Sequence, residues 1–300
     1  MADLAASGLA GARSGWLSGQ GLLRVLLYGI LILFALYYLA PLYVMVVTSL
    51  KSPDEIRDGS FLELPRVVTF DAWRYAWSEA CVGVNCTGLQ PYFWNSVRMA
   101  IPAVLISTAV GALNGYALTK WRFRGADIMF SLLLFGCFIP FQVVLLPLAQ
   151  TLGWLGLSST TAGLILIHVI YGTAFTTLFF RNYYVSIPDE LVRAATIDGA
   201  GFFTIFFRIF LPLSTPIIMV SLIWQFTQIW NDFLFGVSMM SGNAQPMTVA
   251  LNNIVNTTTG VKRYDADMAA AILTGLPTLL VYIIAGKYFV RGLTAGSVKG

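Results

Sequence analysis

The stretch Ile187-Pro-Asp-Glu-Leu-Val-Arg-Ala-Ala-Thr-Ile-Asp-Gly-Ala200 is a polar-edged segment that lies between long apolar runs. Its spacing at i, i+3, i+4 and i+7 predicts a short amphipathic helix with one face formed by Leu191, Ala194, Ala195 and Asp198. We expect Ser186 to cap this helix, with Asp189 three residues on, and Gly199 to end it. The spacing indicates either a helix that docks a partner in water or an interfacial helix with no partner.

The composition is that of a membrane protein. Of the 300 residues, 57% are hydrophobic and 11% are charged, whereas a soluble domain carries roughly 25% charged residues. The formal net charge of +4 does not indicate nucleic-acid binding, because the basic residues stand singly at the ends of apolar runs, as membrane topology predicts. We therefore expect the lipid bilayer, and not nucleic acid, to surround most of this chain.

Six apolar runs are long enough to cross a membrane. A hydrocarbon core about 30 Å thick needs roughly 20 helical residues. The sequence therefore predicts an all-α polytopic membrane protein with six transmembrane helices in a domain covering 21–292, preceded by a disordered cytoplasmic N-terminus at 1–20. The predicted spans are 23–50, 96–119, 129–152, 161–180, 215–239 and 269–290.

Lysine and arginine predict the orientation of these spans. The loop after the second span holds Lys120, Arg122 and Arg124, and the loop after the fourth begins at Arg181. Positive residues are enriched on the cytoplasmic side of a membrane. This bias predicts that both termini and the 181–214 loop are cytoplasmic and that the 51–95 loop is external.

The external loop contains the only close pair of cysteines, Cys81 and Cys86. An oxidising location favours a disulfide between them over two free thiols. Closing so short a loop contributes on the order of 2 kcal/mol on the chain-entropy estimate. No metal site is expected, because the only histidine, His168, lies in the fourth span, away from these cysteines.

Prolines and glycines within the spans indicate a packed bundle. Each proline removes a backbone donor and tends to kink its helix, and small residues let two helices approach closely. The kinks are expected at Pro41, Pro102, Pro140, Pro147 and Pro277, and the close approach at Gly111, Ala112 and Gly115.

No catalytic or nucleotide-binding motif is present in the sequence. The phosphate-binding pattern G-x-x-x-x-G-K-[ST] is missing, and so are the clustered histidines and cysteines of a metal enzyme. We therefore expect this chain to have no enzyme activity and no cofactor of its own.

Asp232 is the clearest carboxylate inside a predicted span. A charge at the bilayer centre costs roughly 2.5 to 3.5 kcal/mol on insertion scales, so we expect Asp232 to face protein or water. The same patch contains Gln225, Trp230 and Asn231. Two interpretations stay open: the patch lines a pathway for a transported solute, with the tryptophan ring stacking on it, or it packs and caps helices.

The 187–212 segment resembles the EAA loop of permease subunits from binding-protein-dependent ABC importers, in its sugar-importer form. The resemblance continues at Asn95-Ser96, at Trp230-Asn-Asp-Phe-Leu-Phe235 and at the terminal Gly292-Leu-Thr-Ala-Gly-Ser-Val-Lys-Gly300. Most of the chain is thus similar to the second permease subunit of maltose-type carbohydrate importers. The resemblance implies the type I permease fold of ABC importers.

In that family the short helix of the loop sits in a cleft on the ATPase and moves with it. Carried over by position and spacing, the ATPase-coupling residues are Glu190, Leu191, Arg193, Ala194, Ala195, Asp198 and Gly199. One residue departs from the family pattern: Arg193 stands where the family has a glutamate, so either it meets an acidic group or the partner permease carries the glutamate. The cytoplasmic tail at 293–300 is implied to contact the ATPase through Gly296, Ser297 and Lys299.

The resemblance also implies the partners. A second homologous permease would complete the channel, an ATPase dimer would bind ATP-Mg in the cytoplasm, and a sugar-binding protein would dock outside, all at the inner membrane of a bacterium or archaeon. The cysteine-containing outer loop resembles that of monosaccharide (glucose or mannose) importers. The alternatives are an ion-coupled secondary transporter, which would need more membrane carboxylates, and a membrane-embedded transferase, which would need clustered catalytic groups.

Overall fold

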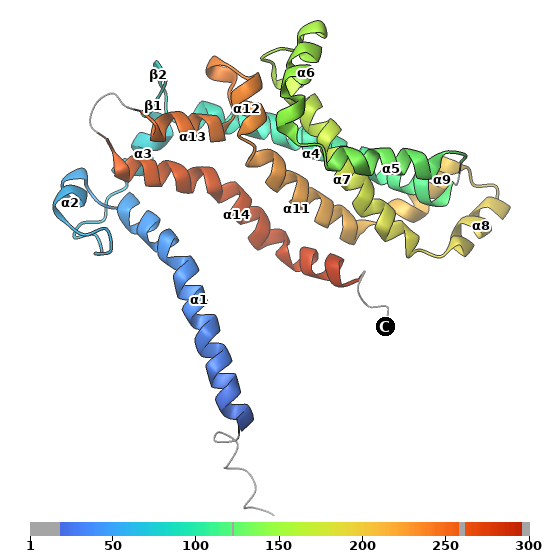
Figure 1. The fold of residues 1–300 in the computed structure, drawn as a ribbon, viewed down its shortest axis with the longest axis horizontal. Coiled ribbons are helices and arrows are strands. Elements are labelled where there is room, and N and C mark those ends of the chain that lie inside the picture. The colour runs from blue at the N-terminus through green and yellow to red at the C-terminus, as the bar shows by residue number, and fades with distance from the viewer. Residues whose placement is uncertain (1–18, 122, 258–261, 296–300) are drawn as a thin grey trace, which may run out of the picture.

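The computed structural model describes residues 19–121, 123–257 and 262–295, which form a bundle of helices with one small hairpin (Figure 1). The first half contains α1 (Gly19–Ser49), α2 (Pro53–Asp58), α3 (Asp71–Ser78), β1 (Cys81–Val82), β2 (Asn85–Cys86), α4 (Gln90–Lys120), α5 (Ala126–Cys137) and α6 (Phe141–Trp154). The second half contains α7 (Thr161–Val185), α8 (Asp189–Ile197), α9 (Phe202–Ile205), the π-helical turn η1 (Phe206–Phe210), α10 (Leu211–Leu213), α11 (Thr215–Trp230), α12 (Leu234–Met239), the 3-10 turn η2 (Gly242–Ala244), α13 (Met247–Val255) and α14 (Tyr264–Ala295). The predicted all-α class is confirmed.

Four of these helices are long and apolar enough to cross a membrane, namely α1, α4, α7 and α14. Two further candidates are bent pairs: α5 with α6 at 103°, and Phe202–Leu213 with α11 at 78°. Counting each bent pair as one span gives six spans in the part of the chain that the structure describes.

The third predicted span, 129–152, is sharply bent near Pro140, where the sequence analysis expects a kink. Its break lies between Cys137, where α5 ends, and Phe141, where α6 begins. Pro140 explains the break, because proline disfavours the helical conformation at the residue before it and has no backbone N–H to donate. The other prolines of the spans lie inside helices that continue past them: Pro41, Pro102, Pro147 and Pro277.

The fifth predicted span, 215–239, is also interrupted. α11 ends at Trp230, and α12 begins at Leu234. The carboxylate of Asp232 accepts hydrogen bonds from the backbone N–H groups of Phe235 at 3.3 Å and Gly236 at 3.1 Å. These bonds satisfy N–H groups in the first turn of a new helix, which is why the chain turns here.

α4 and α7 form the closest helix pair of the bundle. A Cβ atom added at Gly111 would overlap the side chain of Thr176, and one added at Gly115 would lie 2.6 Å from Cβ of Phe180. The Thr176 hydroxyl donates to the carbonyl of Ser107 at 2.8 Å, which ties the two backbones together. The predicted close approach at these glycines is confirmed.

The apolar core is divided between the two ends of the bundle. One cluster surrounds Trp230 where α3, α4, α7, α11, α13 and α14 meet, and the other surrounds Phe180, Tyr184 and Phe210 near α8. At the first end, the Asn95 side chain donates to the carbonyls of Asn243 and Gln245, at 2.6 and 3.1 Å. The 51–95 segment and the loop that follows α12 therefore lie together, and Figure 1 shows α8 at the opposite end of the molecule.

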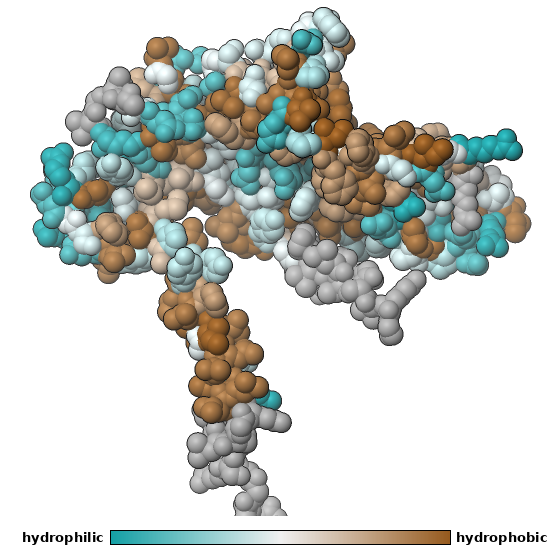
Figure 2. Space-filling view, in the orientation of Figure 1, coloured by the Kyte–Doolittle hydropathy of each residue, from teal (hydrophilic) through white to brown (hydrophobic). Residues whose placement is uncertain are grey.

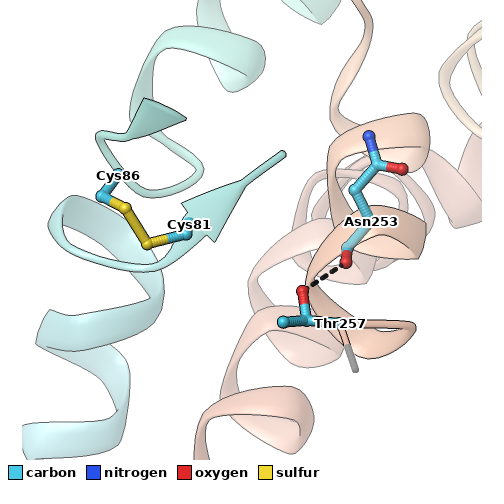
Figure 3. Close-up of a disulfide and its surroundings, with 4 residues drawn as sticks. All are labelled: Cys81, Cys86, Asn253 and Thr257. Carbon is cyan, nitrogen blue, oxygen red and sulfur yellow. Dashed lines mark hydrogen bonds between the residues drawn. A yellow bond between two sulfur atoms is a disulfide. The ribbon is translucent and has the colours of Figure 1, made fainter. Parts of the chain in front are cut away.

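The 51–95 segment is more ordered than the predicted loop. Its last part belongs to α4, which begins at Gln90, and the rest holds α2, α3 and the β1–β2 hairpin. A disulfide joins Cys81 to Cys86 across the hairpin, and Figure 3 shows it facing α13, where the Thr257 hydroxyl donates to the carbonyl of Asn253 at 2.8 Å. The disulfide holds a hairpin that is too short to be stable by itself.

α1 projects away from the other helices (Figure 1). Every side chain from 22 to 43 is exposed, and the helix turns buried only near its end, at 47–49. In Figure 2 the projecting helix is hydrophobic along most of its length, while hydrophilic surface gathers around α2 and around α8. Lipid or another protein must therefore cover α1.

Candidate functional site: an exposed polar helix and a cavity between the spans

α8 is the predicted short helix, but it starts differently from the prediction. Pro188, with φ −60° and ψ 138°, precedes the first helical residue, Asp189. Ser186 does not cap α8, because its hydroxyl donates back to the carbonyl of Tyr183 at 2.7 Å. The rigid proline sets the entry instead, and the acidic Asp189 and Glu190 of the first turn complement the positive end of the helix.

Gly199 ends α8 as predicted. Its φ of +80° is a left-handed conformation that favours glycine. The N–H of Gly199 donates to the carbonyl of Thr196 at 3.0 Å, and the N–H of Ala200 donates to that of Ala195 at 2.9 Å. This pair of bonds is a Schellman motif, which satisfies the free carbonyls of the last turn and turns the chain back toward the bundle.

The two faces of α8 are different. Val192 and Ala195 turn inward and pack against the apolar cluster near Phe210. Ala195 is therefore not part of a purely external docking face, which corrects the face predicted from spacing. The outward stripe is apolar and consists of Leu191, Ala194 and Ile197.

Ile197 is the residue that the sequence analysis missed. Its side chain is 86% exposed at the last turn of α8. The signal was present, since Leu191, Ala194 and Ile197 recur every three residues. Together with Leu191 and Ala194, Ile197 gives α8 an exposed apolar stripe.

Lys120 anchors α8 to the end of α4. Its side chain is 3% exposed, and its ammonium donates to the Asp189 carboxylate at 2.6 Å and to the carbonyl of Ile187. The buried ammonium thus fixes the first turn of α8 against a membrane-spanning helix. Sequence reasoning used Lys120 only as a topology signal, because its partner lies 69 residues away.

The charged residues on the outer part of α8 are weakly held. Arg193 lies 3.9 Å from Glu190 one turn earlier, and both side chains are exposed. An exposed pair of this kind contributes roughly 0.3–0.5 kcal/mol, so both groups are free to meet another surface. Asp198 is also exposed, at the C-terminal end of the helix.

A cavity of about 340 Å³ lies among α5, α6, α7, α11 and α12. Its walls combine aromatic rings with polar side chains, and the residues that matter most are His168, Tyr171, Phe175, Trp224, Gln225 and Asp232. Of the four residues predicted to form a pathway, Gln225 and Asp232 line this cavity.

The other two predicted pathway residues lie elsewhere. Trp230 is 1% exposed, and its indole N–H donates to the carbonyl of Thr274 at 2.9 Å. Its ring is enclosed by Phe93 and Phe226, so it has no free face on which a sugar could stack, and the packing interpretation fits Trp230 better than the pathway interpretation. Asn231 is exposed and does not line the cavity.

For Asp232, both interpretations that the sequence left open are compatible with the structure. Its carboxylate caps α12 and also lines the cavity. His168 on α7 comes close to it, with 3.7 Å between Nε2 and Oδ2 of Asp232. Sequence reasoning placed His168 in the span but did not pair it with Asp232.

Two further expectations concern metals and the tail. Within the ranges described above, no group of three or more His, Cys, Asp or Glu side chains could hold a metal ion. The tail residues Gly296, Ser297 and Lys299 lie outside the described residues.

A bundle of apolar spans with a cavity lined by aromatic and polar side chains and an anchored helix presented at one end has the features of a membrane transport permease. Residues 93–295 match the family model described as the binding-protein-dependent transport system inner membrane component, and the chain belongs to this family. It is therefore a permease component of ABC importers.

Individual relatives cover nearly the whole chain. It is 40% identical over 278 residues to the probable ABC transporter permease protein PH1216 of Pyrococcus horikoshii, covering 92% of this chain and 98% of that protein. It is 32% identical over 293 residues to the xylose/arabinose import permease protein XacI of Haloferax volcanii, covering 90% and 92%. The fold matches a chain of a bacterial ABC transporter involved in the import of the acidic polysaccharide alginate, with a TM-score of 0.77 at 21% identity over 90% of this chain and 96% of that one.

Proposed function

We propose that this chain is a transmembrane permease subunit of an ATP-driven sugar importer. The observation that carries the proposal is α8, which is stopped by Gly199, anchored through Lys120 and apolar along its outward stripe. The family supports import driven by a binding protein. The Haloferax volcanii relative is named a xylose/arabinose import permease, and this supports a sugar as the cargo.

Membership of the family supports the partners that we propose. An ATPase dimer, which binds and hydrolyses ATP-Mg, receives the outward stripe of α8 in a cleft. A second, homologous permease completes the translocation pathway and covers part of the exposed α1. An extracytoplasmic sugar-binding protein docks at the opposite end of the molecule, on the side of the β1–β2 hairpin. The tail residues Gly296, Ser297 and Lys299 contact the ATPase.

The proposed orientation places α8 and both termini in the cytoplasm of a bacterium or archaeon. Two contacts support it. The basic end of α4 meets α8 through Lys120, and the segments expected outside meet each other through Asn95 and Asn243. The disulfide between Cys81 and Cys86 then lies on the external side, where thiols are oxidised.

ATP binding moves the spans through α8. Closure of the ATPase dimer draws α8 along, and the ion pair between Lys120 and Asp189 carries that displacement to α4. Because α4 is locked to α7 at Gly111 and Thr176, both helices move together. The pathway then changes between inward-open and outward-open states, and a monosaccharide such as glucose or mannose crosses. Ion-coupled secondary transport is not favoured, since members of this family depend on a binding protein.

The experiment compares two neighbouring alanines of α8. Ala194→Leu and Ala195→Leu are each introduced into the complete transporter, assembled with its second permease, ATPase and binding protein. Because Ala194 faces outward, Ala194→Leu should reduce ATP hydrolysis stimulated by sugar-loaded binding protein by about tenfold, which corresponds to about 1.4 kcal/mol. The melting temperature of the isolated chain should not change.

Ala195→Leu serves as the matched comparison. Ala195 packs inward, so a larger side chain should destabilise the isolated chain by about 1–3 kcal/mol through overpacking. If sugar-loaded binding protein stimulated ATP hydrolysis in the Ala194→Leu transporter as strongly as in wild type, the docking role of α8 would be refuted.

A further inference from the structure

The cavity between the spans contains two buried polar groups without a hydrogen-bond partner. Nε2 of Gln225 and Nε2 of His168 both lack one in the part of the chain that the structure describes, and the two side chains are 3% and 6% exposed. Leaving such a group unsatisfied costs about 1–3 kcal/mol. Both residues line the same cavity, so a single ligand there would satisfy both.

Gln225 is held in place by the opposite helix. A Cβ atom added at Gly172 would overlap the side-chain amide of Gln225, so the amide lies directly against the backbone of α7. Close packing against a glycine leaves the amide little room to move. A donor fixed in this way is preorganised for one acceptor position.

The carboxylate of Asp232 adds an acceptor to the same wall. It already accepts two backbone N–H groups, yet each carboxylate oxygen has a second lone pair. With Gln225 and His168 it forms a short row of hydrogen-bonding groups on α7 and at the end of α11.

Aromatic rings form the remaining walls. Phe175 and Trp224 lie with their ring centroids 6.1 Å apart, and Tyr171 lies 5.3 Å from Phe235. A sugar ring presents hydroxyl groups at its edge and apolar C–H groups on its faces. A cavity that combines aromatic walls with a few polar groups suits a ligand of this kind.

The size of the cavity limits the ligand. Its volume of about 340 Å³ lies at the small end of the roughly 300–1,000 Å³ range of ligand pockets. This space suits one sugar ring and excludes a longer oligosaccharide chain from lying wholly inside it.

We propose that this subunit itself binds one hexose or pentose ring of the transported sugar in this cavity. One hydroxyl accepts a hydrogen bond from Nε2 of Gln225, and neighbouring hydroxyls bond to Nε2 of His168 and to the carboxylate of Asp232. The ring packs on Trp224. This subsite rests on the proposed sugar import function, and it assigns direct contact with the cargo to this permease.

The experiment combines the substitution of one side chain in the permease with the removal of one hydroxyl group from the sugar. ATP-dependent uptake into proteoliposomes is measured for the complete transporter with D-glucose, D-mannose, D-xylose and L-arabinose, and then with the monodeoxy analogues of the best sugar. Gln225→Met keeps the length of the side chain and removes the donor. We expect it to lower uptake of the parent sugar by about tenfold. We expect it to change uptake of one deoxy analogue by less than about twofold, because that analogue lacks the hydroxyl that Gln225 binds.

The ratio of uptake by wild type to uptake by the variant reports the contribution of the permease alone. The binding protein is the same in both transporters, so its own preference cancels. Gln150→Met is the matched control, because Gln150 is exposed on α6 and does not line the cavity. It should leave uptake of every sugar unchanged. For His168→Asn, we expect uptake of a different deoxy analogue to be unaffected, because His168 bonds to a different hydroxyl. This variant replaces Gln225→Met if Gln225→Met does not reach the membrane.

The outcomes separate the two proposals. If wild type takes up none of the four sugars with ATP, import of these monosaccharides is refuted, and the subsite with it. If wild type imports a sugar and Gln225→Met lowers uptake of the parent and of all its deoxy analogues equally, Gln225 is a structural residue and the subsite alone is refuted. Unchanged uptake by both Gln225→Met and His168→Asn also refutes the subsite and leaves sugar import standing.

Discussion

Gly111 determines how closely α4 and α7 approach each other. The hydroxyl of Thr176 occupies the space where any other residue would place its Cβ atom. That same hydroxyl donates to the carbonyl of Ser107, so the glycine makes a helix-to-helix hydrogen bond possible. One residue without a side chain therefore supports both the packing and the polar contact of the pair.

We predict that Gly111→Ala destabilises the protein by about 1–3 kcal/mol, because the added methyl group must displace Thr176 or separate the helices. The measurement is the unfolding midpoint of the full chain in nanodiscs. Gly275→Ala in α14 is the matched control, since nothing lies within 4 Å of a Cβ atom added there. Equal midpoints for the two variants would contradict this account of the α4–α7 contact.

Single residues were predictable where the constraint is local. Gly199 was predicted from sequence because a helix end needs a left-handed residue within a few positions. Ser186 was assigned wrongly because the neighbouring Pro188 determines the start of α8. The sequence left two interpretations open for Trp230 because its surroundings come from α4 and α14, which are distant in sequence.

α8 illustrates how an element is positioned by something outside itself. Its nine residues include an exposed ion pair, Glu190 with Arg193, that contributes little. The buried ammonium of Lys120 does more, since it bonds both a carboxylate and a backbone carbonyl at the start of the helix. Hydrogen bonds that involve a charged group are worth about 1.5–3 kcal/mol each.

We predict that Lys120→Met increases local opening of α8 by at least about tenfold, because the first turn loses these charged hydrogen bonds. Hydrogen exchange of the backbone amides at 190–197 in the full chain is the measurement. Arg193→Met is the control and should change exchange by less than about threefold, since its ion pair is exposed. Equal protection in wild type and Lys120→Met would show that Lys120 does not hold α8.

The existence of the spans was predictable, and so was a kink at Pro140, but the sharpness of the break there and the interruption after Trp230 were not. A run of about 20 apolar residues must cross a bilayer as a helix, whatever its neighbours are. Proline alone did not identify the broken span, since Pro140 ends a helix whereas Pro147 lies within α6. The neighbours of each proline decide the outcome, and the sequence does not show them.

The molecule as a whole has two hydrophilic ends, built from different elements. The β1–β2 hairpin, α3 and α13 lie at one end, and α8 lies at the other (Figure 1). Hydrophilic surface gathers at both ends, with apolar helices between them (Figure 2). This separation is what a membrane requires, and it makes the proposed orientation testable.

We predict that Val84 and Ala194 lie on opposite sides of the membrane. Val84→Cys and Ala194→Cys are each placed in a chain whose three native cysteines are replaced by serine. A membrane-impermeant maleimide should label Val84→Cys on intact spheroplasts, because the hairpin tip is almost fully exposed. It should label Ala194→Cys only after the membrane is opened. Labelling of Ala194→Cys from outside would reverse the orientation and exclude an ATPase at α8.

The isolation of α1 has a consequence for how the protein is made. α1 leaves the ribosome before the other described helices, and its side chains from 22 to 43 are not buried by any other part of the described chain. It can enter the bilayer before any later helix exists. α4 cannot do so equally well, since its buried Thr108 hydroxyl finds a partner only when Ser221 of α11 has been synthesised. The order of the chain thus places the self-sufficient helix first and the mutually dependent helices after it.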